Sequence, residues 1–216
     1  MNLRWKVAQA AEIRWWKAYL ARKEPLHYLR RKAAYWFRVL ETTGMSPLPD
    51  GPILDAGCGP AGIFIILEGH AVDALDPLLP QYEAALPHFR PGDYPYARFL
   101  PVPLEDFLPG PVYETVFCLN AINHVSHLGR SMEALARCLR PGGRLVLSID
   151  AHNHHLLKKL FQALPGDILH PHQHSLDDYR RMLENRGLQI ERTVRMKKGF
   201  IFDYHLLVAR KPLLSV

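Results

Sequence analysis

Short apolar runs alternate with amphipathic stretches along most of the chain. The apolar runs predict strands at Ile53–Ala56, Ala71–Leu75, Ala97–Val102, Thr115–Leu119, Arg144–Ile149, Gln189–Arg195 and Phe202–Ala209. The stretches between them predict helices at Ala61–Glu68, Leu78–Leu86, Arg130–Cys138, His155–Leu164 and Leu176–Arg186. Alternation of this kind predicts an α/β fold, in which a doubly wound, mainly parallel seven-stranded sheet carries helices on both faces.

The two ends of the chain depart from this alternation. Only a few residues around Lys197–Gly199 separate the last two strands, so they are expected to form an antiparallel hairpin at an edge of the sheet. Residues Leu3–Thr43 favour helix, and Pro25 divides them into two helices. Met45–Pro52 reads as a linker. We therefore expect an N-terminal helical cap over residues 1–45 and a main domain over residues 46–216.

Composition fits a soluble globular protein. Of the 216 residues 48% are hydrophobic and 22% are charged. No apolar run approaches the roughly 20 residues needed to span a bilayer, so we expect no stable membrane insertion. The start of the chain has no apolar signal core, and the three cysteines lie in apolar or glycine-rich contexts that suit reduced thiols. These features favour a cytoplasmic protein, and they carry no signal for an oligomeric state.

The formal net charge of +6 is concentrated in the N-terminal segment, where arginine and lysine alternate with aromatic residues. Such a segment suits a phosphate-bearing partner or an anionic membrane surface. It equally suits a helical cap whose aromatic side packs on the domain and whose basic side faces solvent. No recognised nucleic-acid-binding module accompanies the basic residues, so we expect no nucleic-acid partner.

A glycine-rich turn follows the first strand. The run Gly57-Cys58-Gly59-Pro60-Ala61-Gly62 fits the pattern GxGxxG and is expected to open a helix, with Asp55 just before it. Glycines in such a turn let a nucleotide-type cofactor approach the main chain closely. Asp76 ends the second strand, where a carboxylate can bind ribose hydroxyls. Both a dinucleotide and S-adenosylmethionine require these features, and Asp76 also suits a helix cap.

Three further features favour S-adenosylmethionine: a helical segment precedes the glycine turn, a Pro-Gly-Gly turn within Leu139–Leu147 leads into an apolar strand, and a hairpin closes the chain. Together these residues resemble the class I S-adenosylmethionine-dependent methyltransferases over about Ile53–Arg210. Ala61 departs from the family pattern by replacing its third glycine. The stretch Ala74–Tyr82 has a weaker similarity to members associated with bacterial polysaccharide assembly.

The resemblance implies a binding site for S-adenosyl-L-methionine. Its residues would be Asp55, Gly57, Cys58, Gly59, Asp76, Pro77, Leu104, Glu105, Leu119 and Asn120. The glycine turn and Asp55 would hold the methionine end, Asp76 the ribose, and Glu105, chosen over Asp106, the adenine. Leu119 and Asn120 end the fourth strand and would lie beneath the transferred methyl group.

On the acceptor side, His124 is the candidate general base, because the pKa of histidine lies near neutrality. The alternative is a structural histidine. Candidate acceptor contacts are Trp16, Tyr19, Asn123, His170 and His172. The alternating histidines at His170, His172 and His174 suit a wall of the acceptor pocket better than a metal site, and we assign no metal ligand.

The sequence thus predicts a methyltransferase, with O-methylation of a small molecule or a glycan precursor as the expected reaction. An Asn/Asp-Pro-Pro-Tyr/Phe motif, which relatives use to methylate planar nitrogens, is absent after the fourth strand. The rival enzyme is an NAD(P)-dependent oxidoreductase on a Rossmann-type fold. The rival without catalysis is a methyltransferase-like binding protein.

Overall fold

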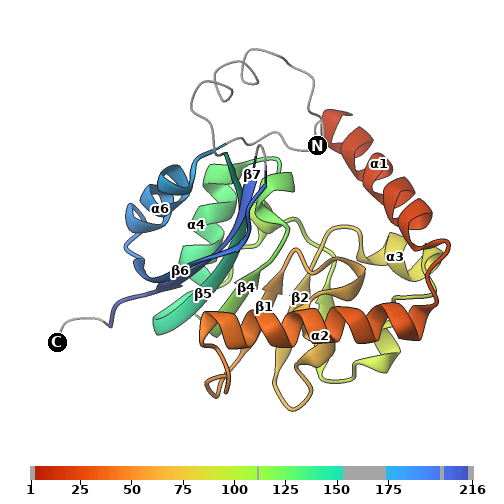
Figure 1. The fold of residues 1–216 in the computed structure, drawn as a ribbon, viewed down its shortest axis with the longest axis horizontal. Helices are drawn as coiled ribbons and strands as arrows, with labels where there is room; N and C mark the ends of the chain where they lie inside the picture. The colour runs from red at the N-terminus through yellow and green to blue at the C-terminus, as the bar shows by residue number, and fades with distance from the viewer. Residues whose placement is uncertain (1–2, 111, 153–173, 200–201, 214–216) are drawn as a thin grey trace.

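The computed structural model describes residues 3–110, 112–152, 174–199 and 202–213. They form a central sheet with helices on both faces (Figure 1). The helices are α1 (Leu3–Leu20), α2 (Pro25–Thr43), α3 (Leu79–Ala85), α4 (Leu128–Cys138) and α6 (Leu176–Glu184). The strands are β1 (Ile53–Ala56), β2 (Val72–Leu75), β3 (Ala97–Leu100), β4 (Tyr113–Cys118), β5 (Leu139–His152), β6 (Gln189–Lys197) and β7 (Phe202–Arg210). The chain therefore has the α/β architecture that its hydrophobic pattern predicts.

The sheet contains seven strands in the order β3-β2-β1-β4-β5-β7-β6. The first five strands along the chain pair in parallel, whereas β7 is antiparallel to both β5 and β6. This confirms the predicted parallel sheet and the closing hairpin. The strand order reverses between β1 and β4, and in open α/β sheets ligands bind beside the carboxyl ends of strands at such a point.

Side chains alternate between two apolar cores on the two faces of the sheet. Ile53 and Phe117 point toward α2 and belong to the first core. Leu54, Val116 and Leu145 point to the other face and pack in a second core beneath α4 and α6 (Figure 1). Because both faces are covered, the central strands carry the near-continuous apolar runs that made them visible in the sequence.

The helix predicted at Ala61–Glu68 is wrong. Two short 3₁₀ turns, Gly59–Ala61 and Ile63–Ile66, follow the glycine loop instead. Gly62 has an extended backbone (φ −68°, ψ −175°), which breaks the helical path between them. The N–H of Phe64 donates to Oδ2 of Asp55 (3.0 Å) and not to a carbonyl four residues earlier. Local geometry around the loop therefore prevents the helix that amphipathic spacing indicates.

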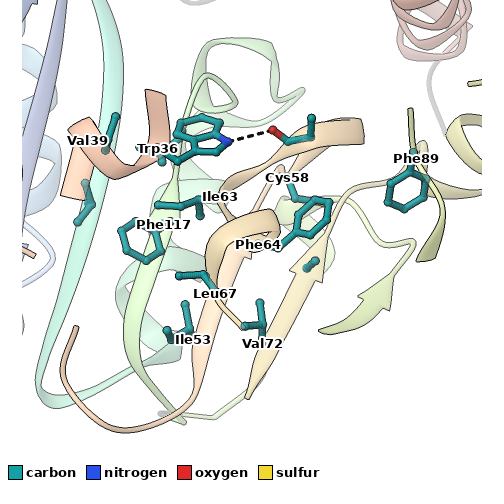
Figure 2. Packing of buried hydrophobic residues seen from close by; sticks show 14 of the residues in the cluster. Trp36, Val39, Ile53, Cys58, Ile63, Phe64, Leu67, Val72, Phe89 and Phe117 are labelled. Carbon is teal, nitrogen blue, oxygen red and sulfur yellow. Dashed lines mark hydrogen bonds between the residues drawn. The ribbon is translucent and has the colours of Figure 1, made fainter. Parts of the chain in front are cut away.

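Helix α2 covers the part of the sheet face that the two 3₁₀ turns after β1 leave open. Trp36 is almost fully buried, and its indole N–H donates to the carbonyl of Ala61 (3.1 Å). Figure 2 shows Trp36 and Val39 above Ile63 and Phe117, within the same apolar cluster. Glu24 caps α2 by accepting from two backbone amides, and Gly44 ends it in the left-handed conformation (φ 72°). The second helix of the predicted cap is thus anchored directly on the glycine loop.

The predicted helix His155–Leu164 lies outside the described residues. Apart from it, the other predicted helices and strands are present, with ends that differ by a few residues. In the part of the chain that the structure describes, none of the helices combines the length and the apolar character that crossing a bilayer requires.

Candidate active site

A cleft lies at the carboxyl ends of the central strands, between the glycine loop and the two N-terminal helices. Its lining residues are Gln9, Glu12, Trp16, Lys32, Trp36, Gly57, Cys58, Gly59, Pro60, Ala61, Leu75, Asp76, Pro77, Val102, Pro103, Leu104, Glu105, Leu119, Asn120, Ala121, His124 and Val125. Nine of the ten predicted cofactor residues are among them, and the tenth, Asp55, is not. The structure therefore brings the separate sequence motifs together in one site.

The glycine loop is shaped by close contacts that only glycine tolerates. Gly57 has φ +72°, and a Cβ atom there would lie 2.3 Å from Cβ of Ala121. A Cβ atom at Gly62 would lie 2.3 Å from Oδ2 of Asp55. The amides of Gly57 and Cys58 both donate to the carbonyl of Leu75 (2.7 and 3.0 Å), which fixes the loop against β2. This cradle fits a ligand that packs against bare main chain.

Asp55 supports the loop from below. Asp55 is 1% exposed, and its carboxylate accepts a hydrogen bond from the amide of Phe64. It does not line the cleft. Burial raises the pKa of Asp55 to about 7, while hydrogen bonds from the loop backbone oppose that shift. The structure thus places Asp55 where it orders the loop, although the motif alone suggested direct contact with the cofactor.

Asp76 faces the cleft at the end of β2. Gly59 N donates to its Oδ2 (3.0 Å), and Leu78 N donates to its Oδ1 (2.9 Å). A carboxylate accepts about four hydrogen bonds, so each oxygen keeps a lone pair for a further donor. Asp76 therefore bonds to the backbone just ahead of α3 without capping that helix, whose N-cap residue is Leu78, and it retains the capacity to bind two ribose hydroxyls.

The ionisation of Asp76 predicts a specific pH dependence of stability. Burial, followed by the charge of Glu12, raises its pKa from 3.8 to about 7. The folded protein therefore binds this proton more tightly than the unfolded chain, and stability from this group is lost as pH rises from 3.8 to 7. We expect Asp76→Asn to gain stability relative to the native protein between pH 5 and pH 8, by a few kcal/mol at most.

Urea unfolding at the two pH values measures this difference, and histidine titration cancels because both proteins contain the same histidines. Asp50→Asn, at an exposed position, is the matched control. Its difference in stability from the native protein is expected to be the same at pH 5 and at pH 8. An Asp76→Asn difference that stays constant from pH 5 to pH 8 would contradict the raised pKa.

Glu105 lines the cleft from the short turn Leu104–Asp106. Its side chain is buried, and Oε1 accepts from both the amide and the hydroxyl of Ser126. Ser131 donates to Oε2 at 3.4 Å, which leaves that oxygen one free lone pair. Asp106, by contrast, is paired with Arg130 on the surface and does not line the cleft. The geometry supports the choice of Glu105 over Asp106.

Polar groups gather at the end of β4. The amide of Asn120 donates to Oγ of Ser148 (2.6 Å). The hydroxyls of Tyr35 and Tyr204 share a hydrogen bond (3.0 Å). Asn120 has φ +56°, which is uncommon for a residue other than glycine. The bond to Ser148 supports this backbone conformation at the edge of the cleft.

The predicted acceptor residues are distributed unequally. His124 and Trp16 line the cleft, and the edge of the Trp16 ring faces Tyr82. Tyr19 is 41% exposed and stacks on Trp15 away from the cleft lining. Asn123 is buried behind the cleft, where Tyr179 donates to its Oδ1 (2.8 Å). The structure thus brings two of these residues to the cleft, whereas His170 and His172 lie outside the described residues.

Several residues of the site were not predicted from the sequence. From the N-terminal helices these are Gln9, Lys32 and Trp36, and around the end of β4 they are Tyr35, Ser148 and Tyr204. Ser148 gave a signal, because it is a lone polar residue within the apolar run Leu145–Ile149. The others lie on amphipathic segments, where spacing alone does not separate residues that face the cleft from residues that face the core.

Comparison with known proteins agrees with this geometry. Residues 26–193 match a family described as "Methyltransferase domain". A tRNA U34 carboxymethyltransferase of Mannheimia succiniciproducens is 30% identical over 131 residues, which are 56% of this chain and 40% of that protein. A ubiquinone biosynthesis O-methyltransferase of Paracidovorax citrulli is 27% identical over 155 residues, which are 68% of this chain and 62% of that protein. The chain thus spans less than two thirds of either relative.

Among solved structures, the fold is similar to that of magnesium protoporphyrin IX methyltransferase from Synechocystis PCC 6803 with bound S-adenosylhomocysteine. The TM-score is 0.56 at 24% identity, and the match covers 86% of this chain and 84% of the other. At this identity the likeness shows the fold.

Proposed function

The chain belongs to the methyltransferase domain family, and we propose that it transfers a methyl group from S-adenosyl-L-methionine to an acceptor at the carboxyl edge of the sheet. One observation carries the proposal: a single cleft contains the glycine cradle, Asp76 and Glu105, and each of these acids has a lone pair to spare. Family membership decides against the oxidoreductase alternative. So does the antiparallel β7 between β5 and β6, which a classic dinucleotide fold lacks.

The residues of the chain have distinct tasks in this reaction. When bound, the cofactor supplies an activated methyl group on a sulfonium. Gly57 and Gly59 permit close contact with the main chain, Asp76 accepts ribose hydroxyls, and Glu105 accepts from the adenine amine. Asn120, whose backbone amide is held by Ser148, orients the reacting groups. These assignments place the acceptor beside Asn120 and His124.

We propose oxygen of a small molecule or a glycan precursor as the methyl acceptor. The similarity to a ubiquinone biosynthesis O-methyltransferase supports a small-molecule acceptor. The Tyr35 and Tyr204 hydroxyls at the end of β4 suit a polar acceptor. Burial raises the pKa of both tyrosines, so they remain protonated and able to donate. The glycan alternative rests only on the resemblance of Ala74–Tyr82 to polysaccharide-associated enzymes.

A tRNA acceptor is the second candidate. The tRNA U34 carboxymethyltransferase among the relatives supports it. So do exposed basic side chains on α1 and α2, among them Arg14, Lys17, Arg30 and Arg31. Arginine and lysine on one surface favour phosphate contacts. This candidate departs from our expectation that nucleic acid is no partner.

Transfer of labelled methyl from S-adenosylmethionine tests the proposal. The acceptors are dihydric phenols, sugar nucleotides and bulk tRNA, supplied separately. We expect label in a small-molecule fraction; label confined to tRNA would favour the second candidate. Binding of S-adenosylhomocysteine without transfer to any acceptor would favour the binding protein and count against catalysis.

His124→Ala tests the proposed general base. We expect turnover to fall about 100-fold or more at saturating acceptor, which is the range for loss of a positioned base. The affinity for S-adenosylhomocysteine, measured by calorimetry, should stay the same. His127→Ala, at an exposed position close by, is the control and should retain full turnover. Undiminished turnover of His124→Ala would exclude the role.

A further inference from the structure

Lys32 brings a positive charge into the cleft without a carboxylate partner. It projects from α2, and its Nζ lies 4.2 Å from the ring centroid of Trp36 and 5.4 Å from that of Tyr35. Within the described part of the chain, Lys32 makes no ion pair. Among the described residues that line the cleft it is the only lysine or arginine. The contacts of its ammonium group are therefore aromatic faces.

The interior of the cleft is an unfavourable place for this charge. Burial lowers the pKa of Lys32 to about 8, and the nearby charge of Asp55 opposes that shift. The other acids that line the cleft are Glu12, Asp76 and Glu105, and the charge of Glu12 acts on Asp76. The proposed function assigns Asp76 to the ribose and Glu105 to the adenine. Lys32 is half-buried. A partly desolvated cation without an ion-pair partner costs a folded protein stability, so a binding role is the physical reason to retain one here.

We propose that Lys32 binds the carboxylate of the methionine moiety of the cofactor. This inference rests on the proposed function. The carboxylate is the anionic group of S-adenosylmethionine, and the methionine end is assigned to the glycine loop that Lys32 faces. Without Lys32 the carboxylate would enter a cleft whose charged groups are acids, with the buried Asp55 close to its site. Lys32 supplies the missing counter-charge, and its pairing relieves the cost of burying it.

Replacement of Lys32 should change the melting temperature in opposite directions, depending on whether the residue stabilises the fold or binds the cofactor. If Lys32 only stabilised the fold, Lys32→Met would lower the melting temperature. If it is held for the cofactor, the same change removes a half-buried charge that has no ion-pair partner, and we expect the melting temperature of the free protein to rise by about 3 °C or more at pH 7. Affinity for the cofactor falls at the same time. Stability and binding thus move apart.

Calorimetric titration with S-adenosylmethionine and with decarboxylated S-adenosylmethionine isolates the carboxylate, since the two ligands differ in that group alone. We expect the native protein to prefer the carboxylated form about 10- to 100-fold, as a charge-assisted contact provides. Lys32→Met and Lys32→Gln should lose that preference while still binding the decarboxylated ligand. Lys17→Met, at an exposed position on α1, should behave like the native protein.

Two outcomes overturn the assignment. If the Lys32→Met protein keeps the full preference for the carboxylated ligand, another group binds the carboxylate. The proposed function then stands without Lys32. Equal loss of affinity for both ligands, with a lowered melting temperature, shows a structural role. A native protein that binds neither ligand contradicts the proposed function itself, so the two failures are distinguishable.

Discussion

Gly57→Ala is expected to abolish cofactor binding, with affinity for S-adenosylhomocysteine lowered about 100-fold or more. Two costs combine at this position. The backbone has φ +72°, which disfavours any residue with a Cβ atom, and that atom would lie 2.3 Å from Cβ of Ala121. Because Gly57 N donates to the carbonyl of Leu75 (2.7 Å), the loop cannot move away without losing its attachment to β2.

Two variants separate the clash from the backbone strain. Gly69→Ala carries comparable strain (φ +90°), yet no atom lies within 4 Å of its Cβ position, so binding should be unchanged. Ala121→Gly in the Gly57→Ala background removes the opposing methyl group and should restore part of the affinity. Calorimetric titration measures both effects. Full affinity of Gly57→Ala alone would show that the loop does not cradle the ligand.

Trp36→Ala is expected to lower the free energy of unfolding by about 3–5 kcal/mol, the usual cost of removing a buried aromatic side chain. Trp36 is 2% exposed, and it is the contact through which α2 reaches the glycine loop. Since α2 packs on the 3₁₀ turns after β1, the loop loses its cover as well as its hydrogen bond at Ala61. We therefore expect weakened cofactor binding together with the loss of stability.

Urea unfolding of three variants tests this role. Phe37→Ala removes the neighbouring aromatic residue, which is 53% exposed, and should change stability by less than about 0.5 kcal/mol. Trp36→Phe keeps most of the apolar volume but loses the bond to Ala61, so an intermediate cost of about 1–2 kcal/mol is expected. A Trp36→Ala protein as stable as Phe37→Ala would contradict the anchoring role of α2.

The sequence was sufficient to predict the sheet because burial on both faces makes each central strand a recognisable apolar run. The short link at Lys197–Gly199 likewise predicted the hairpin. The prediction of a helix at Ala61–Glu68 was wrong for a reason that lies outside the sequence of that segment. The amide of Phe64 donates to Asp55, and Trp36 bonds to the loop from the preceding helix, 25 residues before Ala61. Amphipathic spacing carries no information about such competing partners.

The residues of the candidate site likewise divide into those that the sequence could predict and those that it could not. Residues at the ends of strands could be predicted, because parallel strands bring their carboxyl ends to one edge, and Asp76, Glu105 and Asn120 all reach the cleft. From α1 and α2, Trp16 was predicted but Lys32 was not, since the orientation of Lys32 on the helix is what distinguishes it from its exposed basic neighbour Arg31. Asp55 shows the converse, a motif residue that the structure places beneath the loop.

Calorimetric titration with S-adenosylhomocysteine and, separately, with NADH tests the central claim most directly. Both ligands contain adenosine, so the comparison depends on what the glycine loop and the methionine end of the cleft accept. We predict saturable binding of S-adenosylhomocysteine at one site per chain and no binding of NADH. Binding of NADH without binding of S-adenosylhomocysteine would contradict the proposed methyl-donor site.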